Sequence, residues 1–167
     1  MVMHDMPFGS REAPYVDRIQ PHVSTLVVNM LTETIARIKS HYPKAGKVGL
    51  MATSGTVQSR LYHNAAAAEG LELVAPDSDH QQLVMDAIYG ETGVKAGYTL
   101  GQCRTQLQQA YGHLEDQGAD VVILGCTELP LIAPELIREG QPPLLDPTDI
   151  LARKCVELAL DANAHNS

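Results

Sequence analysis

Two hydrophobic periods alternate along the chain. Short apolar runs rich in β-branched residues, typical of strands buried in a parallel sheet, come at residues 24–28, 47–52, 71–75, 120–124 and 144–146. Between them, apolar residues recur at the spacing of amphipathic helices at residues 31–41, 61–68, 83–89, 99–117 and 149–160. This alternation predicts a three-layer α/β fold, in which a mostly parallel sheet of four to five strands is flanked by helices.

Polar side chains indicate where two of these helices begin, and two cysteines lie on the apolar sides of helices. Asp79 and Thr148 are the predicted N-caps of the third and fifth helices. Cys103 shares the apolar stripe of the fourth helix with Leu100, and Cys155 lies on the apolar stripe of the fifth. Both thiols are therefore predicted to be packed in the core.

The chain of 167 residues has the length of a single domain. Residues 1–22 show no clear period and predict an N-terminal arm, with a short helix over residues 15–20. Residues 23–162 form the predicted α/β domain, and residues 163–167 form a polar, disordered tail.

The amino-acid composition argues against some classes of partner and indicates a cellular compartment. A formal net charge of −8 argues against nucleic acid or an anionic membrane surface as a partner. The sequence has no apolar run of about 18 residues, so we expect no membrane span. Three cysteines without framework spacing, and a start that lacks the pattern of a secretory leader, predict free thiols and a cytoplasmic protein.

Reactive side chains follow two of the predicted strands. Cys126, Thr127 and Glu128 come after the strand at 120–124, with Pro130 placed like the start of a new helix. Thr53–Thr56 follow the strand at 47–52. Ligands of open α/β sheets bind at the carboxyl ends of the strands, so both stretches are candidates for the active site.

A thiol at a helix N-terminus has its thiolate stabilised, so Cys126 is predicted to have a lowered pKa and to act as a base or nucleophile. The alternative is a small buried hydrophobic residue. No Cys or His lies at metal-ligand spacing from Cys126, and none of the seven His is assigned to a site, so no metal is predicted. Thr53, Ser54 and Thr56 offer hydroxyl groups to a carboxylate or phosphate, although Thr56 can equally be a helix cap. Lys95 alone is typical of a solvated surface lysine.

Three stretches, KVGLMATSGTVQSRLY, IYGETGVKAG and GADVVILGCTELPLI, occur in this order and together resemble the C-terminal half of the aspartate/glutamate racemase family. The resemblance runs from about residue 23 to residue 160 and implies a flavodoxin-like half domain. It also implies inversion at Cα of an acidic amino acid, with two cysteines on opposite faces and no cofactor. The implied ligand is a small acidic amino acid or dicarboxylate. By this resemblance Cys126 is one of the two catalytic cysteines. The implied substrate-binding residues are Thr53, Ser54, Thr56, Lys95, Thr127 and Glu128.

The chain departs from the family pattern at its N-terminal end. In the family, the first cysteine lies in a Cys-Asn-Thr-type motif of the N-terminal half, whereas residues 6–13 here contain no cysteine. Three alternatives follow: a racemase-type domain whose other half comes from elsewhere, a single-cysteine relative such as a malonate-type decarboxylase or isomerase, or a truncated, non-catalytic binding or oligomerisation module. A missing half would leave apolar surface near residues 26–30 and 144–145, so we expect a homo-oligomer, most simply a dimer.

Overall fold

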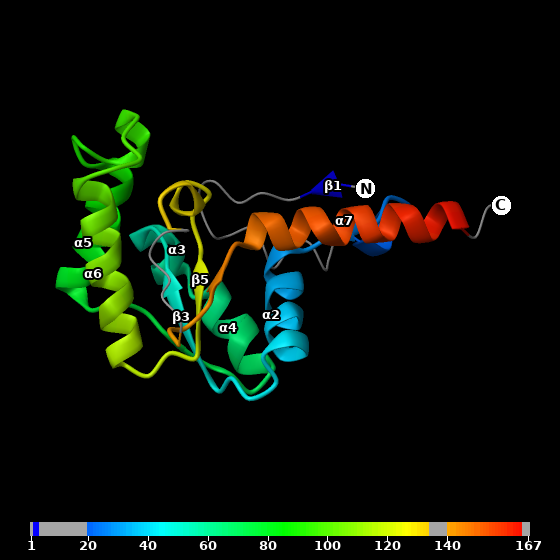
Figure 1. Cartoon of the computed structure of the whole chain (residues 1–167). Helices are drawn as coiled ribbons and strands as arrows, with labels where there is room; N and C mark the ends of the chain where they lie inside the picture. Colours follow the sequence, from blue (N-terminus) through cyan, green and yellow to red (C-terminus); the bar gives the residue numbers. More distant parts are fainter. Residues whose placement is uncertain (1, 4–19, 134–139, 165–167) are drawn as a thin grey trace.

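The computed structural model describes residues 2–3, 20–133 and 140–164. Its centre is a parallel four-stranded sheet in the order β4-β3-β5-β6 (Figure 1), which confirms the predicted α/β class. The strands are β3 (Lys47–Met51), β4 (Glu72–Val74), β5 (Val121–Leu124) and β6 (Leu144–Leu145).

The register of the two central strands determines where a site can form. Met51 pairs with Leu124, the last residue of β5, so β3 and β5 end at the same level. At the other end, Asp120 Oδ2 accepts hydrogen bonds from the backbone N–H groups of Gly46 (2.8 Å) and Lys47 (2.9 Å). Burial would raise the pKa of Asp120, but these backbone hydrogen bonds, that of Lys47 foremost, lower it overall.

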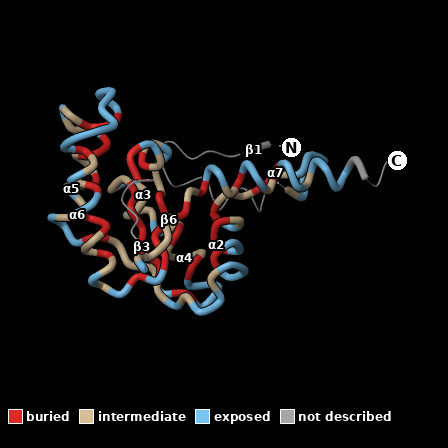
Figure 2. Tube along the Cα trace, in the orientation of Figure 1, coloured by how far each residue is buried: buried red, intermediate tan, exposed pale blue. Residues whose placement is uncertain are grey.

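Helices cover both faces of the sheet. Helices α5 (Ser78–Tyr89) and α6 (Gln102–Asp116) pack on one face, and α2 (Met30–His41) and α4 (Leu61–Ala68) pack on the other (Figure 1). Successive residues of β5 alternate between these layers: Val122 lies in the core beneath α5 and α6, whereas Val121 and Ile123 lie in the core beneath α2 and α4. Figure 2 shows the buried residues concentrated at this sheet and on the inner sides of the helices.

The first predicted strand does not join this sheet. Only Val27–Val28 (β2) is extended, and it pairs in parallel with β1 (Val2–Met3) as a separate two-stranded sheet. Gln20–His22 form a short 3₁₀ helix, η1. The rest of the helix predicted at residues 15–20, most of the predicted arm, and residues 165–167 of the predicted tail lie outside the described residues.

Two helix predictions need correction. The helix expected through residues 61–68 is preceded by a separate short helix, α3 (Ser54–Ser59), and the two meet at Arg60, which has a left-handed φ of 58°. The stripe of α6 begins at Cys103 and not at Leu100: Leu100 precedes the helix and is 64% exposed, because Gly101 turns the chain with a φ of 78°. Cys103 and Cys155 are both buried, as predicted.

Both predicted N-caps are wrong. Asp77 caps α5, since its Oδ1 accepts a hydrogen bond from the backbone N–H of His80 at 2.9 Å. The last helix, α7, runs over Pro147–Ala164, and Asp146 Oδ1 accepts from the N–H of Thr148 at 2.8 Å. In each case the helix begins earlier than expected, so the cap is the acidic residue that ends the preceding strand or loop.

The second half of α7 projects beyond the body of the domain (Figure 1). Its start packs through Leu151 and Cys155 against Val28, but Val156 and Leu160 are largely exposed. Exposed apolar surface, expected near residues 26–30 and 144–145, occurs at Leu26 but not at Leu145, which is buried. None of the helices in the described ranges is both long and apolar enough to cross a membrane.

Candidate active site

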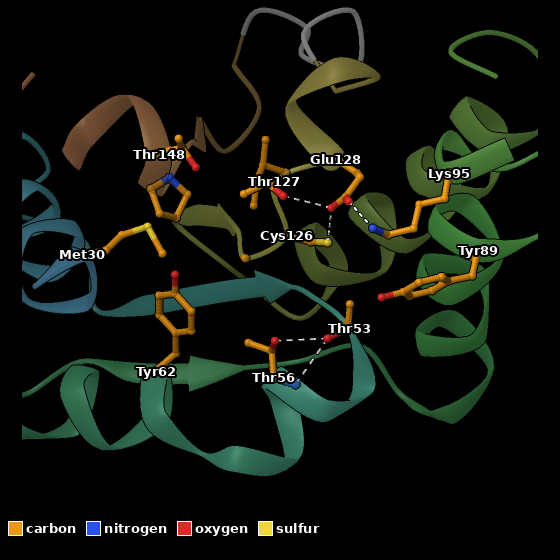
Figure 3. Close-up of a pocket in the computed structure, with 13 residues that line it drawn as sticks. Met30, Thr53, Thr56, Tyr62, Tyr89, Lys95, Cys126, Thr127, Glu128 and Thr148 are labelled. Atoms are coloured by element: carbon orange, nitrogen blue, oxygen red, sulfur yellow. Dashed lines mark hydrogen bonds and ion pairs between the residues drawn. The ribbon is translucent and has the colours of Figure 1, made fainter. Parts of the chain in front are cut away.

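A cavity lies where β3 and β5 end (Figure 3), the edge at which ligands bind in open α/β sheets. The loops after the two strands meet directly, because the Gly125 N–H donates to the Met51 carbonyl at 2.7 Å. The cavity holds about 70 Å³. This is several times the ~10–15 Å³ that one water needs and far below the roughly 300–1,000 Å³ of pockets for drug-sized ligands. It therefore suits a small metabolite.

The loop after β5 supplies the reactive groups. Cys126 lies in a bend, and the chain continues through a turn into a three-residue 3₁₀ helix, η3 (Leu129–Leu131). The helix predicted to start at Pro130 is thus, within the described residues, a single 3₁₀ turn. Such a short turn lacks the aligned peptide dipoles that stabilise a thiolate at the start of a long α-helix.

Cys126, Glu128 and Lys95 form a connected chain of side chains at this loop (Figure 3). The Cys126 Sγ donates to Glu128 Oε2 at 2.9 Å, and the exposed Thr127 hydroxyl donates to the same oxygen at 3.1 Å. The other carboxylate oxygen, Oε1, pairs with Lys95 Nζ at 2.5 Å. Lys95 comes from η2 (Val94–Ala96), where it lies 5.5 Å from the centre of the Tyr89 ring.

The prediction of a lowered Cys126 pKa is wrong. Burial first, and then the hydrogen bond and negative charge of the Glu128 side chain, together raise the pKa of this thiol to about 12, because the charge of Lys95 lowers it too little to compensate. Burial alone would also raise the pKa of Glu128, but hydrogen bonds from Cys126, Lys95 and Thr127 outweigh burial and lower it to about 2. The hydrogen bond to Glu128 raises the pKa of Lys95. At neutral pH the site therefore holds a thiol, a carboxylate and an ammonium group.

The loop after β3 contributes hydroxyl groups. Thr53 is the N-cap of α3, its Oγ1 accepting weakly from the Thr56 N–H at 3.4 Å, and the two threonine hydroxyls lie 3.1 Å apart. Both also line the cavity, so the capping and the lining roles coincide. Ser54 is not among the lining residues, because it faces α5: its N–H contacts Met85 Sδ at 3.3 Å and its hydroxyl accepts from Gln81 Nε2 at 3.4 Å.

The structure thus brings together all but one of the predicted site residues, namely Thr53, Thr56, Lys95, Cys126, Thr127 and Glu128. It adds apolar and aromatic lining residues that the sequence did not indicate, namely Met30, Tyr62, Tyr89 and Pro147. Met30 and Tyr62 lie on one side of the cavity and Tyr89 lies on the other, beside Lys95 (Figure 3). Pro147 follows β6 closely, so the rule that ligands bind at strand ends could have found it. The other three lie on helices, where no sequence signal separates them from ordinary packing residues.

The lining residues offer little to a metal ion. Cys126 and Glu128 are the metal-ligand types among them, and their functional atoms are engaged with each other. A zinc site takes at least three protein ligands. The arrangement instead suits proton transfer, because a thiol proton lies in a partly enclosed cavity beside a fixed cation and two hydroxyl groups.

The chain matches a known protein family over most of its length. The model of the Asp/Glu/hydantoin racemase family matches residues 10–155. The chain is 32% identical over 143 residues to the "uncharacterized protein in pnlA 3′ region" of Pectobacterium carotovorum, which covers 84% of this chain and 90% of that protein. It is 25% identical to the broad specificity amino-acid racemase RacX of Bacillus subtilis, over 87% of this chain and 60% of that protein.

A solved structure shows the same fold. An aspartate racemase homologue from Pyrococcus horikoshii superposes with a TM-score of 0.73 at 26% identity, covering 90% of this chain but 63% of the other. The chain therefore spans somewhat under two thirds of these longer racemase chains, as a racemase half domain does. The matched family model, together with the shared fold, shows that the chain belongs to the Asp/Glu/hydantoin racemase family.

Proposed function

We propose that the chain carries one half of a cofactor-independent racemase site, in which Cys126 transfers a proton to Cα of a small acidic amino acid such as aspartate or glutamate. The observation that carries the proposal is the Cys126 thiol, hydrogen-bonded to Glu128 and paired through it to Lys95, at the edge of a small cavity. Family membership supports the reaction class, and the relative RacX, a broad specificity amino-acid racemase, supports an amino-acid substrate.

The protonation states of Cys126 and Glu128 indicate whether Cys126 donates or accepts a proton in its resting state. With its pKa near 12, the resting thiol is a proton donor. Glu128, with a pKa near 2, does not remove this proton at rest and instead orients the S–H bond. In the proposed step a carbanion at Cα takes the proton from Sγ, which leaves a thiolate near Lys95. The base that removes the first Cα proton from the opposite face is supplied from outside the described residues.

Substrate binding follows from the charges of the cavity. The Lys95 ammonium and the hydroxyls of Thr53 and Thr56 are donors for substrate carboxylates. Because Lys95 is already paired with Glu128, a substrate carboxylate competes with this ion pair. Binding at Lys95 would loosen its hold on Glu128 and change the hydrogen bond that orients the thiol.

We extend this proposal to the oligomeric state of the protein and to its location in the cell. The exposed apolar residues Leu26, Val156 and Leu160 are the surface we assign to a dimer, in which a second chain closes the open side of the cavity. We also propose a cytoplasmic location, which the free thiols of all three cysteines support. Light scattering at micromolar concentration tests the dimer, and a monomeric mass contradicts it.

A second candidate activity draws on the same protonated thiol. A single-cysteine enzyme needs only one proton transfer: the C–CO₂ bond of a malonate breaks, its electron pair remains in an enediolate, and Cys126 returns a proton to that carbon. A donor already protonated at neutral pH favours this reaction, because no second base is required. Retention of the fold without catalysis, as a binding module, is the third alternative.

Incubation of L-aspartate, L-glutamate and a substituted malonate in D₂O separates these activities. Racemisation gives deuterium at Cα and the D-enantiomer, whereas the single-donor reaction releases CO₂ without racemising an amino acid. We expect activity to vanish in Cys126→Ala and to persist in Cys155→Ala, which removes a thiol from the core and not from the cavity. Deuterium uptake that survives Cys126→Ala would contradict the proposal, and calorimetry without heat for any of these ligands would remove the binding module as well.

A further inference from the structure

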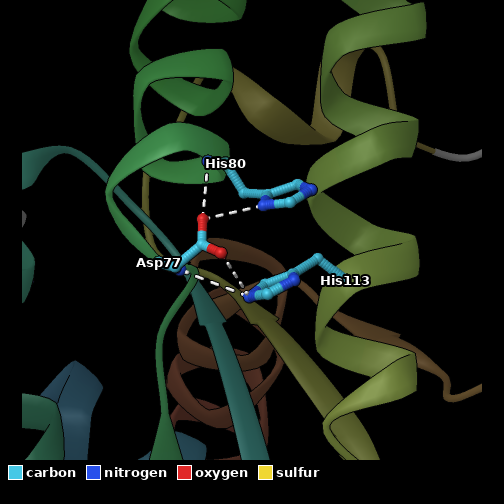
Figure 4. Close-up of side chains that lie close together, drawn as sticks. All are labelled: Asp77, His80 and His113. Carbon is cyan, nitrogen blue, oxygen red and sulfur yellow. Dashed lines mark hydrogen bonds and ion pairs between the residues drawn. The ribbon is translucent and has the colours of Figure 1, made fainter.

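Three residues outside the candidate active site bring metal-binding side chains together (Figure 4). Asp77 follows β4 and caps α5, His80 lies in the first turn of α5, and His113 lies near the end of α6. The cluster therefore joins the start of one helix to the end of its antiparallel neighbour. None of its residues lines the cavity at Cys126.

The distances within the cluster are short. His80 Nδ1 lies 2.7 Å from Asp77 Oδ1, and His113 Nε2 lies 3.5 Å from Asp77 Oδ2. One ligand atom of each residue lies within 4.8 Å of the other two. Ligand atoms around a tetrahedral Zn²⁺, each about 2.0–2.2 Å from the ion, are roughly 3.3–3.6 Å apart. The His80–Asp77 pair is closer than this and other pairs can be up to 4.8 Å apart, so the three side chains must rearrange to reach that spacing.

The hydrogen bonds show which ring nitrogen of His113 is unprotonated, and a bound ion would replace those hydrogen bonds. The Asp77 N–H donates to His113 Nε2 at 3.3 Å, and the side-chain nitrogen of Gln117 lies 2.6 Å from the same atom. Nε2 is thus the unprotonated nitrogen, and an unprotonated imidazole nitrogen is what a metal ion requires. His80 Nδ1 shares a proton with Asp77, and this proton must pass to solvent when an ion binds.

We propose that Asp77, His80 and His113 form a site for Zn²⁺, with one carboxylate oxygen, His80 Nδ1 and His113 Nε2 as ligands and water in the remaining position. Two imidazoles and a carboxylate, without a thiolate, are a donor set that suits Zn²⁺. The side chains of His80 and Asp77 are 33% and 53% exposed, which leaves an entry path from solvent.

Binding requires one ring to turn. The two imidazoles are stacked with their centres 4.0 Å apart and their planes 9° apart. Lone pairs in parallel planes do not converge on one ion, so a bound ion separates the stack. His80, the more exposed of the two rings, is the one that has room to rotate.

The position of the site gives the ion a structural consequence. Gln81, next to His80, donates to the carbonyl of Ala52 at 2.9 Å, just before the Thr53 loop. An ion that holds the start of α5 against α6 would therefore fix the helix that supports this loop. The proposed site does not depend on the activity assigned to Cys126.

Titration of the untagged, metal-free protein with Zn²⁺ against a chromophoric chelator tests the proposal. We expect one bound ion per chain and a higher melting temperature. The variants His80→Gln and Asp77→Asn should weaken binding by more than the about 10–100-fold that loss of an outer-shell partner costs. His41→Gln, which removes an exposed histidine of α2, and Cys126→Ala should bind as the wild type does.

Co²⁺ provides a second readout that does not depend on the stability of a variant. A nitrogen- and oxygen-ligated tetrahedral ion gives intense visible absorption without the sulfur-to-metal charge-transfer band of a thiolate site. Equal Zn²⁺ affinity in His80→Gln and wild type, or a thiolate band that disappears in Cys126→Ala, would overturn the proposal.

Discussion

The loops after β3 and β5 occupy equivalent places at the ends of neighbouring strands, yet they satisfy their polar groups differently. In the loop after β3, Thr53 and Thr56 bond to each other within one helical turn. The hydrogen bonds that reach this loop from Gln81 and Met85 of α5 involve no charged group. The loop after β5 depends on a distant segment, because Glu128 pairs with Lys95 beyond α5. The first is a helix cap that also lines the cavity, whereas the second holds charges whose positions depend on tertiary structure.

Because of this difference, we expect substitutions in the first loop to affect mainly helix stability, and substitutions in the second to affect the pKa values of the site. Hydroxyl groups that cap a helix carry no charge, so their loss is felt mainly by that helix. A thiol, a carboxylate and an ammonium group in contact control one another's pKa, so the loss of one changes the other two. Three substitutions test whether the two loops are as independent as this comparison implies.

The largest effect is expected where the two loops touch. A Cβ at Gly125 would lie 2.9 Å from both Ala52 Cβ and Leu50 Cδ1, which are completely buried. Gly125→Ala should therefore lower the free energy of unfolding by about 2 kcal/mol, in the range of core overpacking. Urea denaturation measures this value. Gly112→Ala is the matched control, since a Cβ there meets nothing within 4 Å in α6 and should stabilise by about 0.5–1 kcal/mol.

The second effect concerns the charged loop. Glu128→Gln removes the negative charge that raises the pKa of Cys126 and leaves only a neutral acceptor, so this pKa should fall toward that of a free thiol. If the pKa of Cys126 falls by one unit, about ten times more thiolate is present at pH 8. Alkylation by iodoacetamide at this pH should then become roughly tenfold faster.

In the unmodified chain, Cys126 should react more slowly than a model thiol at the same pH, and its rate should keep rising above pH 9 because its pKa is about 12. Mass spectrometry assigns the modified residue, and Glu69→Gln, at an exposed position outside the cavity, controls for the loss of a charge. A Glu128→Gln variant that alkylates no faster would show that burial alone sets the pKa.

The smallest effect is expected at the uncharged loop after β3. Thr53→Ala removes the weak cap of a six-residue helix, so we expect a loss of about 0.5–1 kcal/mol in urea denaturation. The alkylation rate of Cys126 should stay unchanged, because Thr53 is not among the groups that shift its pKa. A changed rate would mean that the two loops are coupled, and the comparison would fail.

Much of the fold could be predicted from hydrophobic periods. The central strands and the helices α2, α5, α6 and α7 lie close to their predicted ranges, because buried strands and amphipathic helices carry strong periodic signals. The break at Arg60 could not be predicted, since no Gly or Pro marks its left-handed backbone. Leu100 fitted the helical period by chance, and only the turn at Gly101 shows that it is exposed.

The location of the site could be predicted from the sequence, but the protonation state of its thiol could not. The strand-end rule located Cys126 and Thr53, and the family resemblance added Lys95, which lies 33 positions from its partner Glu128. Burial around the thiol is a tertiary property, so the sequence indicated the wrong direction for the pKa of Cys126. His80 and His113 are equally far apart along the chain, and only the antiparallel packing of α5 and α6 brings them together.

The register that joins β3 to β5 also bears on how quickly the cavity can form. The Lys47 N–H meets the Asp120 carboxylate across 73 positions of chain, so this pairing closes a long loop that contains β4, α5 and α6. Closure entropy must be overcome before such non-local contacts stabilise the sheet, which makes parallel pairings slow steps in folding. We therefore expect the two walls of the cavity to come together late in folding. A ligand that contacts both Thr53 and Cys126 would stabilise the pairing of β3 with β5, so the native state should unfold more slowly.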